Sequence, residues 1–279
     1  MKFESLLFGT AGIPLSCKGG TTSDGIEQVR NLGLECMELE FVRNVNIKKE
    51  KAPPIKELAR KNKVVLSCHG QYFINLNSLE PEKVTASKKR ILNAAEIANL
   101  CGAFSMCFHA AYYMGQEPKG VYERVKSQLK EVIQFLQENS NPIWIRPELT
   151  GKETQFGNLQ EILKLSTELE QVMPCIDFSH CHARYNGKYN SYEEFYSILA
   201  EIERTLGREC LDNLHIHVSG IEYGPKGEKN HLNLEESDLN YKGLIKAWQE
   251  FKIKGVIISE SPNIEGDALL MKRSYEKDF

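Results

Sequence analysis

The chain of 279 residues repeats one order throughout, in which a short apolar run is followed by a segment with helical periodicity. The apolar runs show little alternation with polar residues, which is typical of parallel strands covered on both faces. Eight runs alternating with eight helical segments predict an α/β fold, with residues 1–279 forming a single closed (β/α)8 barrel of the TIM type. An open doubly wound sheet is the alternative. The predicted strands are residues 6–11, 34–41, 64–69, 103–109, 143–149, 172–178, 214–219 and 256–260, and the predicted helices are residues 23–32, 54–62, 81–100, 121–138, 159–169, 192–206, 241–251 and 267–275.

The composition is that of a globular protein, because 41% of the residues are hydrophobic and 26% are charged. No apolar run reaches the roughly 18–20 residues that cross a bilayer, and the opening residues lack the apolar stretch of a signal peptide. We therefore expect a cytoplasmic protein that does not bind membranes. The eight cysteines contain no Cys-x-x-Cys pair and are interpreted as reduced thiols. A net charge of −3 argues against non-specific binding to nucleic acid but leaves room for a local basic surface.

All seven histidines lie at the carboxyl end of a predicted strand or in the loop that follows it. In a barrel those ends form one face, so side chains distant in sequence converge there. Imidazoles and carboxylates are ligands of Zn²⁺, Mn²⁺ and Fe²⁺, and crowded carboxylates repel one another unless a cation lies between them. The sequence therefore predicts a metal site at the carboxyl face. Its candidate ligands are His69, His109, Glu148, Asp177, His180, His217 and Glu260.

The set exceeds what one tetrahedral ion can use, which predicts two or three ions about 3.5–4 Å apart with a bridging carboxylate. His215 shares a strand face with His217 but lies one layer deeper, so we do not expect it to be a ligand. Cys68 and Cys107 are expected to face the helix layer as packing residues.

Six short motifs follow one another along the chain. They are HGQYFINL from His69, HAA from His109, PELTG around Glu148, DFSH from Asp177 to His180, HVSG from His217 and SESP around Glu260. In this order and spacing they resemble the motifs of the endonuclease IV family of apurinic/apyrimidinic endonucleases, which belongs to the xylose isomerase-like TIM barrels. The resemblance covers nearly the whole chain.

The resemblance implies two or three zinc ions, with Mn²⁺ as an alternative. His69 and His109 would hold one ion, Glu148 would bridge it to a second held by Asp177, His217 and Glu260, and His180 and His231 would serve a third. The family presents Asp-x-His after the seventh strand, whereas this chain has Lys229-Asn230-His231. Lysine cannot replace a carboxylate ligand. We therefore expect the third ion to use Glu228 or His182, to bind weakly, or to be absent.

The activity implied by the resemblance is hydrolysis of double-stranded DNA on the 5′ side of an abasic site during base excision repair, by a monomer. Glu148 would orient the attacking water besides bridging the ions. Tyr72 matches a family residue that contacts DNA near the lesion, and packing at the barrel mouth is its alternative role. Basic side chains could contact phosphates at the same face, with solvated surface lysines as the alternative. They lie in residues 43–51 and at Arg184, Lys188, Lys226 and Lys229.

A sugar isomerase or epimerase of the xylose isomerase-like barrels is the main alternative. There Glu148, Asp177, His217 and Glu260 would hold a single ion such as Mn²⁺, and the further histidines would exceed what that chemistry requires. Glu40, at the end of the second predicted strand, has no role in either interpretation. A non-catalytic DNA-binding or metal-storage protein is a third alternative, suggested by the lysine after the seventh strand.

Overall fold

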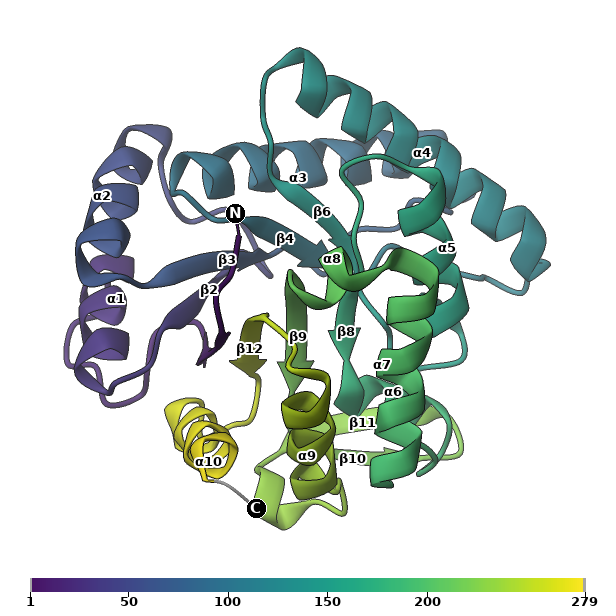
Figure 1. Cartoon of the computed structure of the whole chain (residues 1–279). Coiled ribbons are helices and arrows are strands. Elements are labelled where there is room, and N and C mark those ends of the chain that lie inside the picture. Colours follow the sequence, from purple (N-terminus) through teal and green to yellow (C-terminus); the bar gives the residue numbers. More distant parts are fainter. Residues whose placement is uncertain (1, 278–279) are drawn as a thin grey trace.

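The computed structural model describes residues 2–277 and contains an eight-stranded parallel sheet curled into a barrel (Figure 1). The strands follow the order β6-β4-β3-β2-β1-β12-β9-β8. The two ends of this order meet through bridges between Ile145 and Val172 and between Glu148 and Cys175. The predicted barrel is therefore confirmed, and the open doubly wound sheet is wrong. The strands of the barrel are β1 (Leu6–Ala11), β2 (Cys36–Glu40), β3 (Val65–His69), β4 (Ser105–Phe108), β6 (Trp144–Pro147), β8 (Cys175–Asp177), β9 (Leu214–Val218) and β12 (Gly255–Ser259).

Helices surround the strands on the outside of the barrel (Figure 1). Proline opens two of them, α3 at Pro81 and α4 at Pro118, where the missing N–H costs no helical hydrogen bond. Three others begin with a capping box, in which the first side chain and the acid three residues later satisfy each other's backbone N–H groups. The eight predicted helices correspond to α1 (Thr22–Asn31), α2 (Ala52–Asn62), α3 (Pro81–Leu100), α4 (Pro118–Glu138), α5 (Leu159–Glu168), α7 (Tyr192–Leu206), α9 (Tyr241–Phe251) and α10 (Glu265–Glu276).

Part of the barrel interior is polar, where barrels usually hold branched apolar side chains. Glu38 on β2 accepts a hydrogen bond from Ser67 on β3, and Ser105 on β4 contacts His215 across the barrel on β9. Cys107 also lies in this interior, 3.6 Å from the His217 ring. The expectation that Cys107 faces the helix layer is therefore wrong, because it lies two residues before His109 and shares its strand face.

Several short elements at the ends of the strands were not predicted. Two of them form a hairpin after β9, and two others form a two-stranded ladder after β4 and β6. A seven-residue helix, α6, directly follows β8. Such elements are too short to show a period of 2 or 3.6 residues. The unpredicted elements are β5 (Ala111–Tyr112), β7 (Gln155–Phe156), β10 (Gly220–Gly224), β11 (Gly227–Leu232), α6 (Phe178–Arg184), α8 (Arg208–Leu211), and the 3-10 turns η1 (Lys49–Lys51) and η2 (Leu234–Glu236).

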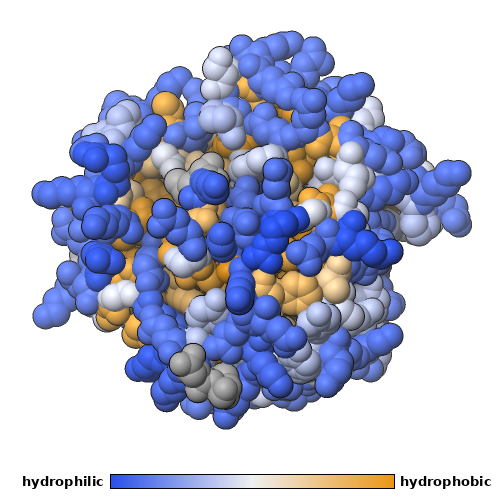
Figure 2. All heavy atoms as spheres, viewed as in Figure 1, coloured by the Kyte–Doolittle hydropathy of each residue, from blue (hydrophilic) through white to orange (hydrophobic). Residues whose placement is uncertain are grey.

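Hydrophilic residues cover most of the face of the molecule seen in Figure 2, and hydrophobic residues are visible in the gaps between them. Within residues 2–277, none of the helices combines the length and apolar character needed to cross a bilayer.

The close approach of β1 to β2 generates a stability prediction. A Cβ atom added at Gly9 would lie 1.7 Å from the backbone oxygen of Cys36, so Gly9→Ala must push the two strands apart. We expect it to lower the free energy of unfolding by about 3 kcal/mol or more in urea titrations. Gly20→Ala is the matched control, because an added Cβ there meets nothing within 4 Å. Equal stability of the two variants would contradict this account of the β1–β2 contact.

Candidate metal centre

The carboxyl ends of the strands surround a cavity of about 250 Å³. Its lining is dominated by imidazoles and carboxylates from separate strands and loops. The structure thus brings together residues more than 190 positions apart in the sequence, from His69 to Glu260. The lining residues are His69, Tyr72, His109, Tyr112, Glu148, Lys152, Gln155, His180, Glu228, His231 and Glu260.

Glu148 lies at the centre of these side chains and is 1% exposed. Its Oε2 atom is 3.3 Å from Nε2 of His69, and its Oε1 atom is 3.5 Å from Nε2 of His109 and 3.4 Å from Nδ1 of His217. Among the described residues, neither carboxylate oxygen of Glu148 has a hydrogen-bond partner. A buried carboxylate without partners is costly, so its surroundings fit a cation.

The separations themselves distinguish coordination from hydrogen bonding. Two ligand atoms about 2.1 Å from one tetrahedral ion lie about 3.4 Å apart, whereas a hydrogen-bonded N–H···O pair is closer to about 2.9 Å. These three contacts of Glu148 lie near the first distance, and a fourth, from its Oε1 atom to Nδ1 of His180, is 3.2 Å. The donors are therefore spaced as neighbouring ligands around an ion.

A second group shares Glu148 and adds Asp177, His217 and Glu260, with donor atoms all within 4.8 Å of one another. Asp177 caps α6, where its Oδ1 atom accepts a hydrogen bond of 2.6 Å from the backbone N–H of His180. Its Oδ2 atom and Nδ1 of His217 are buried without hydrogen-bond partners in residues 2–277. The capping bond fixes the carboxylate and leaves its second oxygen for a ligand.

A third group joins His180, Glu228 and His231. In a regular strand Glu228 and His231 would face opposite sides. The pairing of β10 with β11 shifts register, because Asn230 pairs with Glu222 while Glu228 pairs with Tyr223, which leaves Lys229 as an extra residue. This bulge turns both Glu228 and His231 toward the cavity. Glu228, one of the two replacements expected from the sequence, therefore joins the group.

Lys229 points away from the site. Its ammonium group lies 3.3 Å from a carboxylate oxygen of Glu222, and both side chains are about half exposed. His182, the other expected replacement, also lies elsewhere. Its Nδ1 atom is 3.0 Å from the carbonyl oxygen of Lys188, and its Nε2 atom is 3.1 Å from Asp238. Among residues 2–277, His182 therefore belongs to none of the groups of side chains that could hold a metal ion.

The charges of the site perturb one another strongly. Burial raises the pKa of Asp177 well above its usual range, and the carboxylates of Glu260 and Glu148 add to the rise. Burial also raises the pKa of Glu40 to about 8, and the charge of Glu38 adds to it. Burial would likewise raise the pKa of Glu148, but the imidazoles of His109 and His217 outweigh it and hold that pKa well below its usual range. Divalent cations relieve such crowding of carboxylates.

Tyr72 and Arg184, two residues considered for contact with DNA, have different surroundings in the structure. Tyr72 is 56% exposed, and its ring packs edge-on against His69 at 5.7 Å between centroids. Arg184 is buried and donates to backbone oxygens of Thr150, Lys152 and Gln155. The expectation that Arg184 contacts phosphates is therefore wrong, because its guanidinium group holds the loop after β6.

Sequence reasoning missed Glu38, which contacts both imidazoles of β9 from below the cavity. A carboxylate in the middle of a strand was the available signal, and it received no weight because it does not lie at a strand end. Cys107 and Cys175 were also missed as neighbours of His217. Their placement depends on the barrel interior, which spacing along one strand does not reveal.

The fold and the site define an α/β barrel with imidazole and carboxylate donors gathered at its carboxyl face. Residues 26–276 match the family described as xylose isomerase-like TIM barrel, and the chain belongs to this family. An uncharacterized protein of Methanocaldococcus jannaschii is 42% identical over 272 residues, which are 98% of this chain and 97% of that protein. A probable endonuclease 4 of Persephonella marina is 26% identical over 184 residues, 63% of this chain and 61% of that protein, so the match spans less than two thirds of it.

Two solved structures show the same fold at low identity. Endonuclease IV from Thermus thermophilus has a TM-score of 0.72 and 20% identity, covering 95% of this chain and 98% of its own. A D-tagatose 3-epimerase-like protein has the same TM-score of 0.72 and 16% identity, covering 95% and 94%. These matches confirm that the chain is related to endonuclease IV. The fold does not separate it from the epimerase-like protein, because the two TM-scores are equal.

The third group generates a metal-binding prediction. Replacing Glu228 with alanine removes the only carboxylate of that group, so Glu228→Ala is expected to retain about one zinc ion fewer per chain after equilibrium dialysis. Lys229→Ala is the neighbouring control and is expected to match the unmodified protein, because its ammonium group pairs with Glu222 outside the cavity. If the two variants retain the same amount of zinc, Glu228 is not a ligand.

Proposed function

We propose that this protein is a zinc-dependent phosphodiesterase that cleaves DNA on the 5′ side of abasic sites. The observation that carries the proposal is the set of adjoining donor groups linked through Glu148 and His180, which together offer more ligands than one or two ions use. Glu148 belongs to the separate groups that contain His69 and His109 and to the group of Asp177, His217 and Glu260. His180, 3.2 Å from Glu148, links these groups to Glu228 and His231. Cleavage of a phosphodiester benefits from several cations, because negative charge develops on both the attacking and the leaving oxygen.

The epimerase alternative uses only part of this arrangement. The group of Glu148, Asp177, His217 and Glu260 suffices for the single ion expected of a sugar isomerase or epimerase. Under that interpretation, five further donors around the same cavity have no chemical role. They are His69, His109, His180, Glu228 and His231.

The chain's own residues have distinct tasks in the proposed reaction. Bound zinc ions supply Lewis acids that offset negative charge on the phosphate and make water nucleophilic near neutral pH. Glu148 can orient the attacking water, because its carboxylate lies at the centre of the donors and its oxygens have no hydrogen-bond partners in the described part of the chain. Lys152 lines the mouth of the cavity, where its ammonium group would contact a phosphate oxygen.

The exposed aromatic residues after β3 fit a substrate with a missing base. Tyr72 and Phe73 are 56% and 63% exposed, and Tyr72 lies directly above His69 at the cavity rim. An aromatic side chain placed into the gap left by a lost base restores part of the stacking energy. The substrate we propose is therefore duplex DNA with an abasic site.

Cleavage of a duplex carrying one abasic analogue tests the function. We expect a nick on the 5′ side with the zinc-loaded protein, and none after treatment with a chelator, because the uncompensated carboxylates of the cavity repel a phosphodiester. Glu148→Gln keeps the size of the side chain but removes its charge, and we expect it to lower the cleavage rate at least about 100-fold. An intact duplex in the presence of two or three bound zinc ions would rule out this function. Epimerisation of a ketose with one bound Mn²⁺ would instead establish the alternative.

Tyr72 provides a separate test of the substrate. Tyr72→Ala is expected to weaken binding to abasic duplex about 5- to 150-fold, from the roughly 1–3 kcal/mol that one base–aromatic stack contributes. Binding to an undamaged duplex should change little, and Tyr72→Phe should retain most of the affinity because the ring is kept. Fluorescence anisotropy with labelled duplexes measures all three effects. Equal losses for both duplexes would contradict a role of Tyr72 at the lesion.

A further inference from the structure

A buried carboxylate lies deeper in the barrel than the candidate metal ligands described above. Glu38 on β2 is completely buried, and its side chain points into the barrel interior toward β9. Its Oε1 atom is 2.9 Å from Nε2 of His217, and its Oε2 atom is 2.8 Å from Nε2 of His215. Ser67 donates a hydrogen bond of 2.7 Å to the same Oε2 atom. Three polar side chains from two other strands thus converge on this one carboxylate.

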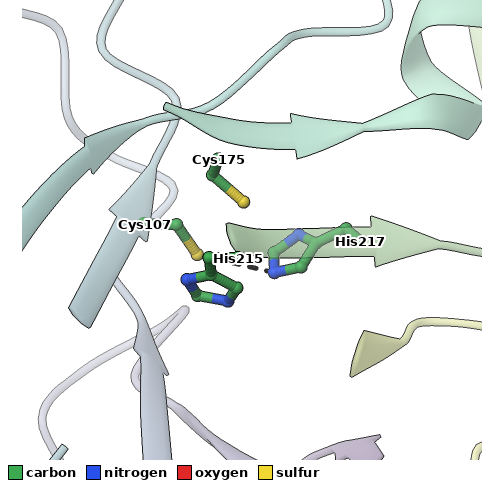
Figure 3. Close-up of side chains that lie close together, drawn as sticks. All are labelled: Cys107, Cys175, His215 and His217. Carbon is green, nitrogen blue, oxygen red and sulfur yellow. Dashed lines mark hydrogen bonds between the residues drawn. The ribbon is translucent and has the colours of Figure 1, made fainter. Parts of the chain in front are cut away.

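Two thiols complete the surroundings of His217, as Figure 3 shows. The donor atoms of Cys107, Cys175, His215 and His217 all lie within 4.8 Å of one another, which resembles a site for a second kind of ion. However, both Nε2 atoms lie nearer to Glu38 than the roughly 3.4 Å expected between neighbouring ligands of an ion. The two imidazoles therefore face a carboxylate with these nitrogens, and the thiols pack beside them.

The contact with Glu38 favours one position for the proton of His217. The negative charge of Glu38, 2.9 Å from Nε2 of His217, attracts an N–H group and repels a nitrogen lone pair, which favours the hydrogen on Nε2. Neutral imidazole has one protonated nitrogen, so Nδ1 then presents a lone pair. This Nδ1 atom lies 3.4 Å from Glu148 and 3.3 Å from Glu260, the ligand spacing found above.

We propose that Glu38 is a positioning residue that holds His217 as the Nε2–H tautomer, so that Nδ1 is available to a cation shared with Glu148, Asp177 and Glu260. The inference rests on the proposed function to the extent that the cavity binds metal. Partners of this kind fix the ring orientation and raise the basicity of the ligating nitrogen. The requirement explains why β2 buries a carboxylate in the barrel, where an apolar side chain would avoid the cost of desolvation.

The position of the proton can be measured directly in the zinc-loaded protein. With ¹⁵N-histidine labelling, the signals of His217 are identified by their loss in His217→Gln. We expect a slowly exchanging proton attached to Nε2 and a zinc-shifted Nδ1 resonance. A proton on Nδ1 would overturn the proposal without the need for any variant of Glu38, so the test does not depend on how well such a variant folds.

Metal affinity supplies the second readout. Glu38→Gln is expected to weaken the zinc ion held by His217 about 10- to 100-fold in chelator competition, and to move the resonance of its Nε2 proton. Glu40→Gln is the control from the same strand, because it removes a second, partly buried carboxyl group that has no contact at ion-pair distance with His217 within residues 2–277. We expect this control to leave the Nε2 proton signal in place and to change zinc affinity less. Equal losses of affinity in both variants, with unchanged His217 signals, would show a purely electrostatic effect and overturn the proposal.

The outcomes also separate this inference from the proposed function. A zinc-loaded protein with the expected His217 tautomer that fails to nick abasic duplex would contradict the function and support the role of Glu38. Failure to bind zinc at all would overturn both. Nicking activity with the proton on Nδ1 would leave the function in place and remove only the role of Glu38.

Discussion

The arrangement of the candidate metal centre depends on one constraint. Several carboxylates share a space from which water is largely excluded. Glu148 and Asp177 are almost completely buried, and each has an oxygen without a hydrogen-bond partner in residues 2–277. Anions in such a space must be neutralised by protons or by cations. The imidazoles around them lie at 3.1–3.5 Å, and most of these distances are longer than a good hydrogen bond and close to the spacing of ligands around an ion. Binding of a cation would therefore offset the repulsion between carboxylates that the folded chain itself creates.

The barrel holds the crowded carboxylates and imidazoles in fixed positions. The strands are joined in register around the whole barrel, so the ends that carry His69, Asp177 and His217 are fixed relative to one another. The polar layer around Glu38 extends this order inward, because it replaces adaptable apolar packing with contacts of defined direction. The stability given up by burying a carboxylate is thus linked to the orientation of a single imidazole.

The fold could be predicted almost completely from the sequence, because eight apolar runs alternating with eight helical segments leave few topologies. The strand-end donors could be predicted for the same reason. Glu228 could not be chosen over His182, since the choice depends on a bulge at Lys229, and an extra residue in a strand leaves no mark in its composition. The side of the strand predicted for Cys107 was wrong. Cys107 lies two residues before His109, and residues two apart in a strand face the same side.

The distribution of donors between strands and loops explains why fold comparison does not separate the two chemistries. Glu148, Asp177, His217 and Glu260, the group that could hold one ion, lie at the ends of barrel strands. Every protein with this fold has such strand ends. By contrast, Glu228 and His231 come from the β10–β11 hairpin, and His180 comes from α6. A global superposition is dominated by the barrel and gives these short elements little weight. Under the proposed function, the number of ions, and with it the reaction, would therefore depend on a few loop residues whose direction is set by one bulge and one helix cap.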